Sequence, residues 1–166
     1  MSFFFQPYVK QLPPLETTIF KRYGGNKEKI KLRSKFEKWV LFNYIERNPL
    51  IKEWNYESHR IPYFDSVKNK NREYIPDFYI EFTNNKKMLL EVKPYSHIFP
   101  SILENVKFSD LNERQLFYYN RMVSNAENNL IKFKAANDWC LDKEMEFCIF
   151  TEEGIFNYEK QKKISV

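Results

Sequence analysis

Two runs of β-forming residues, separated by a turn at Asn84-Asn85, constrain the fold of this chain more than any other feature. The first run covers 74–83 and the second covers 87–93, and both are rich in β-formers. A short asparagine turn between two such runs is typical of a β-hairpin. We therefore predict two antiparallel strands in which the numbers of facing residues sum to about 169.

Charged residues stand on this hairpin where a strand would normally be apolar. Period-two alternation puts Glu91 and Lys93 on one face of their strand. The predicted register brings Asp77 opposite them. Two carboxylates and an ammonium group are costly to bury together without a counter-ion, and a hard divalent cation such as Mg²⁺ or Mn²⁺ would supply one.

This spacing predicts a metal site with hydrolytic chemistry. We expect Asp77, Glu91 and the backbone carbonyl of Val92 to hold the ion, with open positions for water and a phosphate oxygen. Lys93 would then orient or help deprotonate the attacking water, or stabilise the charge that develops on phosphorus. Together these groups are a minimal set for phosphodiester hydrolysis.

The remaining pattern predicts a helix, further strands and a second helix around this hairpin. Ser34 is a good N-cap, with Glu37 as its capping-box partner, and Asn48-Pro49 ends that helix. Short strands are expected at 51–57 and 60–64, a turn between paired strands at 65–71, a loop at 94–100, helical structure beyond 109 that is most regular over 124–141, and a last strand at 145–151. This order predicts an α/β or α+β domain with a central mixed sheet flanked by helices.

Composition limits the function further. At 166 residues the chain has the length of one domain, and three glycines leave no room for a glycine-rich phosphate loop. The net charge of +5 permits a polyanionic partner without requiring one. Cys140 and Cys148 stand outside any Cys or His cluster, and no stretch approaches the roughly 18 apolar residues of a membrane span. We expect a soluble, intracellular protein with no membrane partner.

Pro76-Asp77 followed by Glu91-Val92-Lys93 resembles the signature of the PD-(D/E)xK nuclease superfamily. The Ser34-x-x-Glu37 helix also resembles the additional acidic position of many of those enzymes. Within the superfamily the chain is most similar to tailed-phage head-completion nucleases and to the N-terminal endonuclease domain of TnsA. The motifs that carry this likeness are Glu53-Trp54-x-x-Glu57, Ile75-Pro76-Asp77-Phe78, Glu91-Val92-Lys93-Pro94-Tyr95, Lys132-x-x-x-Ala136 and Phe150-Thr151-Glu152.

The resemblance implies a restriction-endonuclease-like fold and a Mg²⁺- or Mn²⁺-dependent DNA endonuclease. The domain would span 31–153, between an extended N-terminal arm at 1–30 and a C-terminal tail at 154–166. The catalytic residues would be Glu37, Asp77, Glu91 and Lys93, with Glu37 as an additional metal ligand or, alternatively, only a capping residue.

The phage likeness implies a role in virion assembly. The enzyme would act on packaged DNA in the host cytoplasm or within the virion, beside portal, capsid or neck proteins. Two alternatives stay open: a structural head-completion or connector protein that binds the DNA end without cutting it, and a TnsA-like transposon or restriction-type endonuclease. TnsA itself has a second domain, and usually carries Gln where this chain has Glu91.

Four further residues are weaker candidates for DNA contact. Asn129 and Lys132 lie three residues apart on one helical face and reach a phosphate in this interpretation, although a solvated face accounts for them equally well. Tyr95 and His97 follow the Lys93 strand and are also candidates. For His59 we expect a surface or hydrogen-bonded imidazole, and we assign Trp54 and Trp139 to the core.

Overall fold

The computed structural model describes residues 22–25, 30–98, 109 and 111–152 of the chain. The predicted N-terminal arm therefore lies mostly outside the described residues, and the predicted tail lies wholly outside them. The elements in chain order are helix α2 (Lys35–Val40), π-helix η3 (Leu41–Ile45), strands β1 (Ile51–Tyr56), β2 (Ile61–Asp65), β3 (Lys70–Tyr74), β4 (Phe78–Phe82) and β5 (Lys87–Val92), 3-10 helix η4 (Tyr95–His97), helix α3 (Glu113–Leu141) and strand β6 (Glu146–Phe150).

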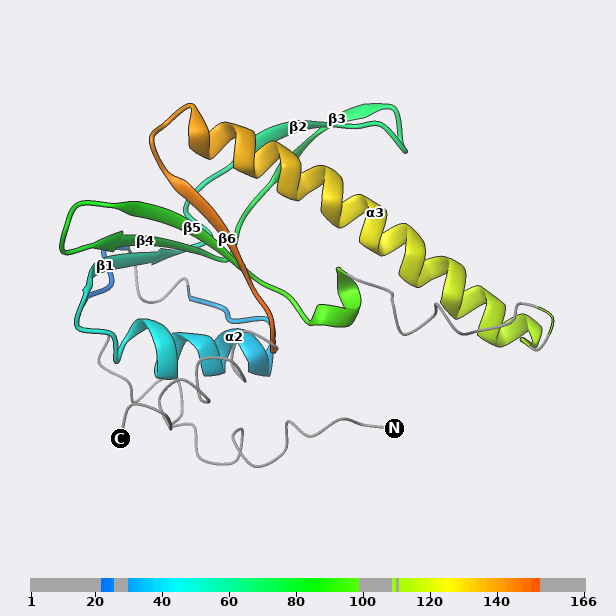
Figure 1. The fold of residues 1–166 in the computed structure, drawn as a ribbon, viewed down its shortest axis with the longest axis horizontal. Coiled ribbons are helices and arrows are strands. Elements are labelled where there is room, and N and C mark those ends of the chain that lie inside the picture. The colour runs from blue at the N-terminus through cyan, green and yellow to red at the C-terminus, as the bar shows by residue number, and fades with distance from the viewer. Residues whose placement is uncertain (1–21, 26–29, 99–108, 110, 153–166) are drawn as a thin grey trace.

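The centre of the molecule is a four-stranded mixed sheet in the order β1-β4-β5-β6. Strands β1, β4 and β5 are antiparallel neighbours, and β6 returns parallel to β5. Helices α2 and α3 lie on opposite faces of this sheet, and the separate β2–β3 hairpin stands beside α3 (Figure 1). This confirms the predicted α+β architecture, which is consistent with a restriction-endonuclease-like fold.

The predicted hairpin forms between β4 and β5 with a register close to the expected one. Phe78 faces Leu90, and Ile80 faces Met88. Extended by one residue, this register sets Asp77 directly opposite Glu91. Asn85, in the turn, has a φ of 63°, a left-handed conformation that asparagine tolerates better than most residues. Local turn chemistry thus determines which acidic residues face each other.

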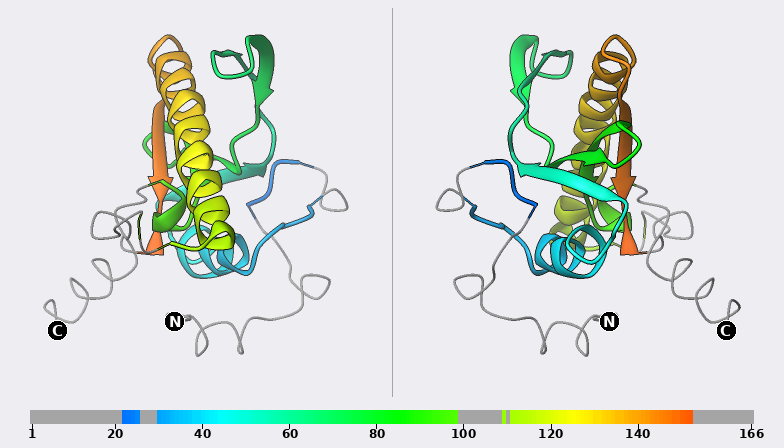
Figure 2. Two further views of the ribbon diagram at one scale, coloured as in Figure 1. Left: turned by 90° about the vertical axis from the view of Figure 1, so that its right-hand side faces the viewer. Right: turned by 90° about the vertical axis from the view of Figure 1, so that its left-hand side faces the viewer.

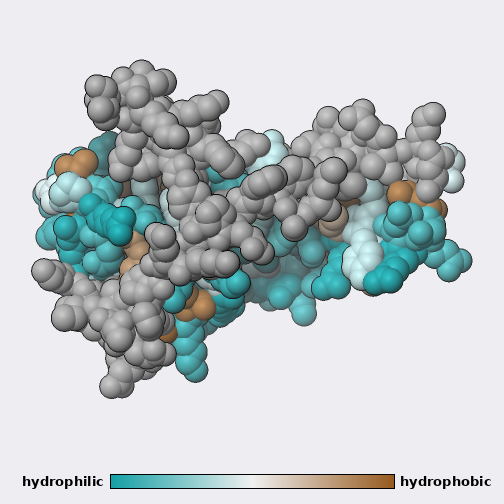
Figure 3. All heavy atoms as spheres, turned by 90° about the horizontal axis from the view of Figure 1, so that it is seen from below, coloured by the Kyte–Doolittle hydropathy of each residue, from teal (hydrophilic) through white to brown (hydrophobic). Residues whose placement is uncertain are grey.

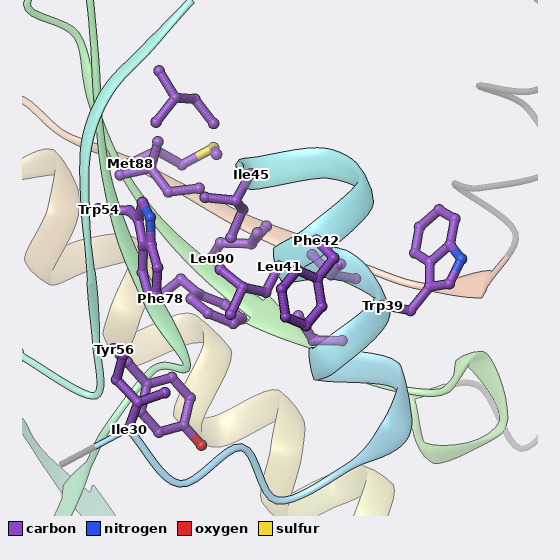
Figure 4. Close-up of a cluster of buried hydrophobic side chains, with 14 residues drawn as sticks. Ile30, Trp39, Leu41, Phe42, Ile45, Trp54, Tyr56, Phe78, Met88 and Leu90 are labelled. Carbon is purple, nitrogen blue, oxygen red and sulfur yellow. The ribbon is translucent and has the colours of Figure 1, made fainter. Parts of the chain in front are cut away.

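The sheet is covered by apolar side chains on both faces. On the α2 side, fully buried Trp54 and Phe78 pack against Leu41 and Ile45 of η3 (Figure 4). On the α3 side, Phe133 packs with residues of β2, β3 and β5, and Figure 2 shows α3 and the β2–β3 hairpin rising side by side above the sheet. Trp54 is a core residue as predicted, and Trp139 is partly buried against the second cluster.

The strand prediction was wrong between residues 65 and 77. The expected turn at 65–71 is shorter, because 70–74 forms strand β3 and pairs with β2. The expected strand at 74–83 is interrupted, and β4 begins only at Phe78. Pro76 explains the interruption, since proline has no N–H to donate to a sheet. The chain therefore leaves one sheet and enters the other at Ile75–Asp77.

The helices also differ in extent from their predictions. The first ends as a π-helix at Ile45. The second is continuous over 29 residues, because Asn112 caps it in a reciprocal capping box with Gln115. The helical structure expected beyond 109 is thus confirmed, and its cap lies well before its most regular part at 124–141.

Residues 22–25 lie along β1. The backbone N–H of Gly24 donates to the carbonyl oxygen of Trp54 at 3.1 Å, and the backbone N–H of Trp54 donates to the carbonyl oxygen of Arg22 at 3.0 Å. Cys140 and Cys148 are free thiols. None of the described helices is both long enough and apolar enough to cross a membrane. Where the described residues are visible in the view from below, they are mostly hydrophilic, with small separate hydrophobic patches (Figure 3).

Candidate functional site

The structure brings the four predicted catalytic residues to one end of the central sheet. Asp77 lies one residue before β4, Glu91 is the second-last residue of β5, and Lys93 directly follows that strand. Glu37 approaches from the first turn of α2. Each of the other three contributes a charge interaction at Lys93, so the groups share one electrostatic environment.

Asp77 and Glu91 form a buried acidic pair. Their exposed fractions are 9% and 3%. Asp77 is fixed by the backbone N–H of Val92, which donates to its Oδ2 at 2.8 Å. Oε1 of Glu91 is bound by Lys93, whereas Oε2 has no hydrogen-bond partner. A buried carboxylate oxygen with no donor is costly and calls for a physical reason.

Burial dominates the electrostatics of this pair. Burial and then the negative charge of Glu91 raise the pKa of Asp77, against the lowering effect of the Val92 N–H. Glu37 raises it further. The protonated form of Asp77 is therefore favoured well above its ordinary range, as expected for carboxylates that share a site without enough positive charge.

Lys93 supplies the positive charge that the structure does contain. Its Nζ lies 2.8 Å from Oε1 of Glu91. Burial disfavours the charged amine, but the attraction of Glu91, Asp77 and Glu37 outweighs burial and raises the pKa of Lys93. Lys93 is thus an ammonium group, and one such group faces three carboxylates.

Glu37 is held by contacts that differ from the predicted capping box. Ser34 caps the helix as expected, since its hydroxyl accepts from the Glu37 N–H at 3.0 Å. The Glu37 carboxylate does not complete the box at Ser34. Its Oε2 accepts from the Arg33 N–H at 2.9 Å and lies 3.0 Å from the Tyr56 hydroxyl. Glu37 is therefore buried and oriented toward the sheet by Tyr56.

Two tyrosines belong to the site and were not predicted. Tyr56 orients Glu37, and Tyr74 lies beside Glu91. Burial, then the charge of Glu91 and a hydrogen-bonding interaction with its carboxylate, raise the pKa of Tyr74. The Tyr74 hydroxyl and Oε2 of Glu91 are both buried, and neither makes a hydrogen bond of normal geometry. Alternation along each strand indicated which face these residues occupy, but no local pattern indicated that the two strands end beside the acids.

The weaker candidates fall into two groups. Lys132 is half-buried near the site: burial and then the charge of Lys93 lower its pKa. The side-chain amide of Asn129 is buried and donates to the carbonyl oxygen of His97 at 3.0 Å, which ties η4 to α3. The Tyr95 N–H donates to Oε2 of Glu152 at 2.7 Å, and the His97 side chain is exposed. DNA contact by these four residues stays a prediction.

His59 has the environment expected of a satisfied imidazole. It stacks on Tyr79 with ring centroids 4.9 Å apart, and its Nδ1 lies 2.9 Å from the Ser58 hydroxyl. Burial lowers its pKa. These contacts account for His59 without a catalytic role.

The acidic pair fits a divalent cation only in combination with main-chain oxygen and water. Within the described ranges, no three His, Cys, Asp or Glu side chains form a group that would hold a metal ion by themselves. Asp77 and Glu91 present hard oxygen donors, one of them without a partner. The Val92 carbonyl is the predicted third protein ligand. A donor set of this composition suits Mg²⁺, which keeps several waters and takes one or two carboxylates.

Comparisons relate this chain to known endonucleases. A family model described as the TnsA-like endonuclease N terminal matches residues 48–152. The chain is also similar to the head completion nuclease of Enterobacteria phage T4, with 29% identity over 134 residues that cover 81% of this chain and 86% of the phage protein. No solved structure matches it. The segment matched by the family model includes Asp77, Glu91 and Lys93 but not Glu37.

Proposed function

The chain belongs to the family of TnsA-like endonuclease N-terminal domains, and from this premise we propose that it is a metal-dependent endonuclease that hydrolyses phosphodiester bonds in DNA. The observation that supports this most is the buried pair Asp77 and Glu91. A scaffold has no physical need to bury two facing acids with an unpartnered carboxylate oxygen, because that arrangement lowers stability. A buried carboxyl group with a strongly raised pKa, such as that of Asp77, is typical of functional sites.

In this proposal Asp77, Glu91 and the Val92 carbonyl hold Mg²⁺ or Mn²⁺. The ion, when bound, would polarise a phosphate oxygen and favour attack by water. The Val92 N–H already fixes one oxygen of Asp77, so that this carboxylate is oriented before any ion arrives. The ion would also relieve the repulsion between the two acids.

Lys93 and Glu37 have separate parts in the proposal. The Lys93 ammonium, fixed at Glu91, brings positive charge to the phosphate that is attacked. Glu37 retains a second oxygen beyond the one that Arg33 and Tyr56 engage, and we assign it to positioning the attacking water or a second ion. Its separate contacts mean that Glu37 can be tested independently of the pair.

The test is cleavage of supercoiled and linear DNA in Mg²⁺, in Mn²⁺ and in EDTA. Glu91→Gln and Lys93→Ala should each lose metal-dependent cleavage. Glu81→Gln is the matched control, because Glu81 lies on the same hairpin and pairs with Lys52 at the surface. Cleavage that is unchanged in both site variants would overturn the assignment. DNA binding by the wild-type chain with no cleavage in either metal would favour the structural alternative instead.

Metal binding has a readout that is independent of activity. An ion that binds only the folded chain stabilises it by about 1.4 kcal/mol at ten times its dissociation constant. Mg²⁺ should therefore raise the thermal unfolding midpoint of the wild type and of Glu81→Gln, but not of Glu91→Gln. An equal rise in all three proteins would place the ion elsewhere.

We further propose that this activity serves the completion of phage heads, by analogy with the T4 protein named above. The enzyme would act on packaged DNA, with portal, capsid or neck proteins as its assembly partners. Cleavage of a linear duplex with a single-stranded end should then be faster than cleavage of an intact circle. Cosedimentation with purified DNA-filled heads, but not with empty heads, would support the assembly role; failure to bind either would contradict it.

A further inference from the structure

The β2–β3 hairpin has an end that carries only positive charge. Residues 66–72 include Lys68, Lys70 and Arg72 and no acidic residue. All seven residues of this end are exposed, and the hairpin belongs to no larger sheet. A cationic projection of this kind contributes little to a hydrophobic core and is suited to contact a polyanion.

Strand pairing directs part of this charge toward the site. Alternation places Lys70, Arg72 and Tyr74 on the same face of β3. Tyr74 lies at the inner end of that face, where it is buried beside Glu91 and packs against Phe133 of α3. Because alternate residues in a strand are about 6.6 Å apart, Lys70 lies roughly 13 Å along the strand from Tyr74. The row therefore begins at the acidic pair and runs outward.

Lys132 connects this row to the active-site lysine. Burial and then repulsion by Lys93 lower the pKa of Lys132, and Arg72 adds to the repulsion. Lys132 thus lies within electrostatic range of both. The tip of the hairpin points to the same side of the molecule as the end of the sheet at which β4 begins and β5 ends (Figure 1). The positive groups Lys93, Lys132, Arg72 and Lys70 consequently form one path.

Asp65 does not interrupt this path. Its side chain is buried, and its two oxygens accept from the Lys68 N–H at 3.0 Å and from Nη1 of Arg72 at 3.1 Å. The contact fixes the Arg72 guanidinium, which has further N–H donors for another anion. Asp65 therefore orients Arg72 from a position next to the turn of the hairpin.

We propose that the α3-facing side of the β2–β3 hairpin, with Lys70 and Arg72 and continued by Lys132, is a track that binds the phosphate backbone of DNA entering the site. This inference rests on the proposed function for the identity of the polyanion. The track binds any DNA sequence, because it contacts phosphates and no bases. It holds the duplex beyond the scissile phosphate and so determines how long a segment of DNA is needed for binding.

The test is the salt dependence of binding to a short fluorescein-labelled duplex, measured by anisotropy in EDTA so that no cleavage occurs. Each phosphate contact contributes about 0.9 to the slope of log K against log salt concentration. Lys70→Gln and Lys132→Gln should each reduce the slope by that amount, which corresponds to about eightfold weaker binding at 0.1 M salt. The double variant should lose about 1.8 from the slope.

Two controls are matched in charge and position. Lys87→Gln removes an exposed lysine at the first position of a strand, as Lys70→Gln does. Lys134→Gln removes a lysine two residues from Lys132 whose partner is Asp138. Both should bind DNA like the wild type, and thermal melting should show that all four variants are folded. Equal slopes in the track variants and the controls would overturn the inference.

This experiment separates the inference from the proposed function. If the wild type never cleaves DNA but both track variants show a reduced salt slope of binding, the DNA-binding track is supported and the nuclease proposal fails. If the wild type cleaves DNA while all variants bind alike, the nuclease proposal stands and the track is wrong. Lys70→Gln is decisive if Lys132→Gln melts early, because the Lys70 side chain is exposed.

Discussion

Asp65 and Asp77 are both buried aspartates, yet their environments shift their pKa values in opposite directions. Burial alone would raise the pKa of Asp65, but the Lys68 N–H and the Arg72 guanidinium outweigh it and lower that pKa. Burial and Glu91 raise the pKa of Asp77, and the Val92 N–H and the charge of Lys93 offset them only in part. One carboxylate is satisfied by the protein itself, and the other is not.

This difference distinguishes a structural acid from an acid held for a ligand. Asp65 closes the turn of the β2–β3 hairpin and fixes Arg72, so its charge is balanced in the folded chain. Asp77 faces Glu91, whose Oε2 lacks a donor. A fold tolerates such a loss of stability where a bound cation later offsets it. If this distinction is correct, substitutions of Asp65 and Asp77 should have different effects on cleavage, on its pH dependence and on stability.

The largest expected effect is on catalysis. Asp77→Asn should reduce metal-dependent DNA cleavage by at least about a hundredfold, because even residues that only orient metal ligands cost up to that factor when replaced. Asp65→Asn should retain most of the activity at saturating DNA, since Asp65 contacts only the hairpin. The measurement is single-turnover cleavage of a labelled duplex. Equal losses in both variants would remove the distinction.

The pH profile should follow Asp77 and not Asp65. The pKa of Asp77 is raised from 3.8 to about 8, so a proton competes with the cation over the neutral range. At limiting Mg²⁺ the cleavage rate should rise up to about tenfold per pH unit below that pKa and then level off. Asp65→Asn should leave the shape of the profile unchanged. A flat rate from about pH 6 to pH 8 would contradict the shift.

Stability without metal should change in opposite directions in the two variants. The pKa of Asp77 is higher in the folded chain than in the unfolded chain, so ionised Asp77 lowers stability progressively as the pH rises from 3.8 toward about 8. Asp77→Asn should therefore stabilise the chain at pH 7 by about 0.5–2 kcal/mol. The pKa of Asp65 is lower in the folded chain, so ionised Asp65 stabilises the fold above pH 3.8, and this stabilisation is lost as the pH falls through the folded-state pKa. Asp65→Asn should therefore lower the thermal unfolding midpoint at neutral pH. Destabilisation by both substitutions, in urea and on heating, would show that Asp77 is also structural.

The sequence predicted the part of the site that depends on one hairpin. Turn residues, β-formers and alternation are local, and together they predicted that Asp77 faces Glu91 with Lys93 on the same side. Pro76 was also a visible signal for the break before β4, and its lack of an N–H should have ended the predicted strand. What a hairpin determines can be predicted from adjacent residues.

The rest of the site depends on packing between distant segments. Glu37 binds the N–H of Arg33 and the hydroxyl of Tyr56, a contact that exists only because α2 packs on β1. Tyr74 meets Glu91 because a second hairpin folds against α3. No period or motif in one sequence encodes these distances. The charge balance that separates Asp65 from Asp77 likewise required the fold.

The smallest expected effect concerns Tyr74, whose buried hydroxyl has no hydrogen-bond partner. Because that hydroxyl makes no hydrogen bond of normal geometry, Tyr74→Phe should change stability by less than about 1 kcal/mol. If the hydroxyl instead serves Glu91 or a water of the loaded site, the same substitution should lower the cleavage rate severalfold without changing DNA affinity. Tyr63→Phe is the matched control on the facing strand, since Tyr63 is buried in the same cluster beside Arg72. An equal fall of the cleavage rate in both variants would mean that Tyr74 acts only in the core of the hairpin. A fall in Tyr74→Phe alone would mean that its hydroxyl serves Glu91 at the active site, whereas Tyr63 beside Asp65 and Arg72 has no such role.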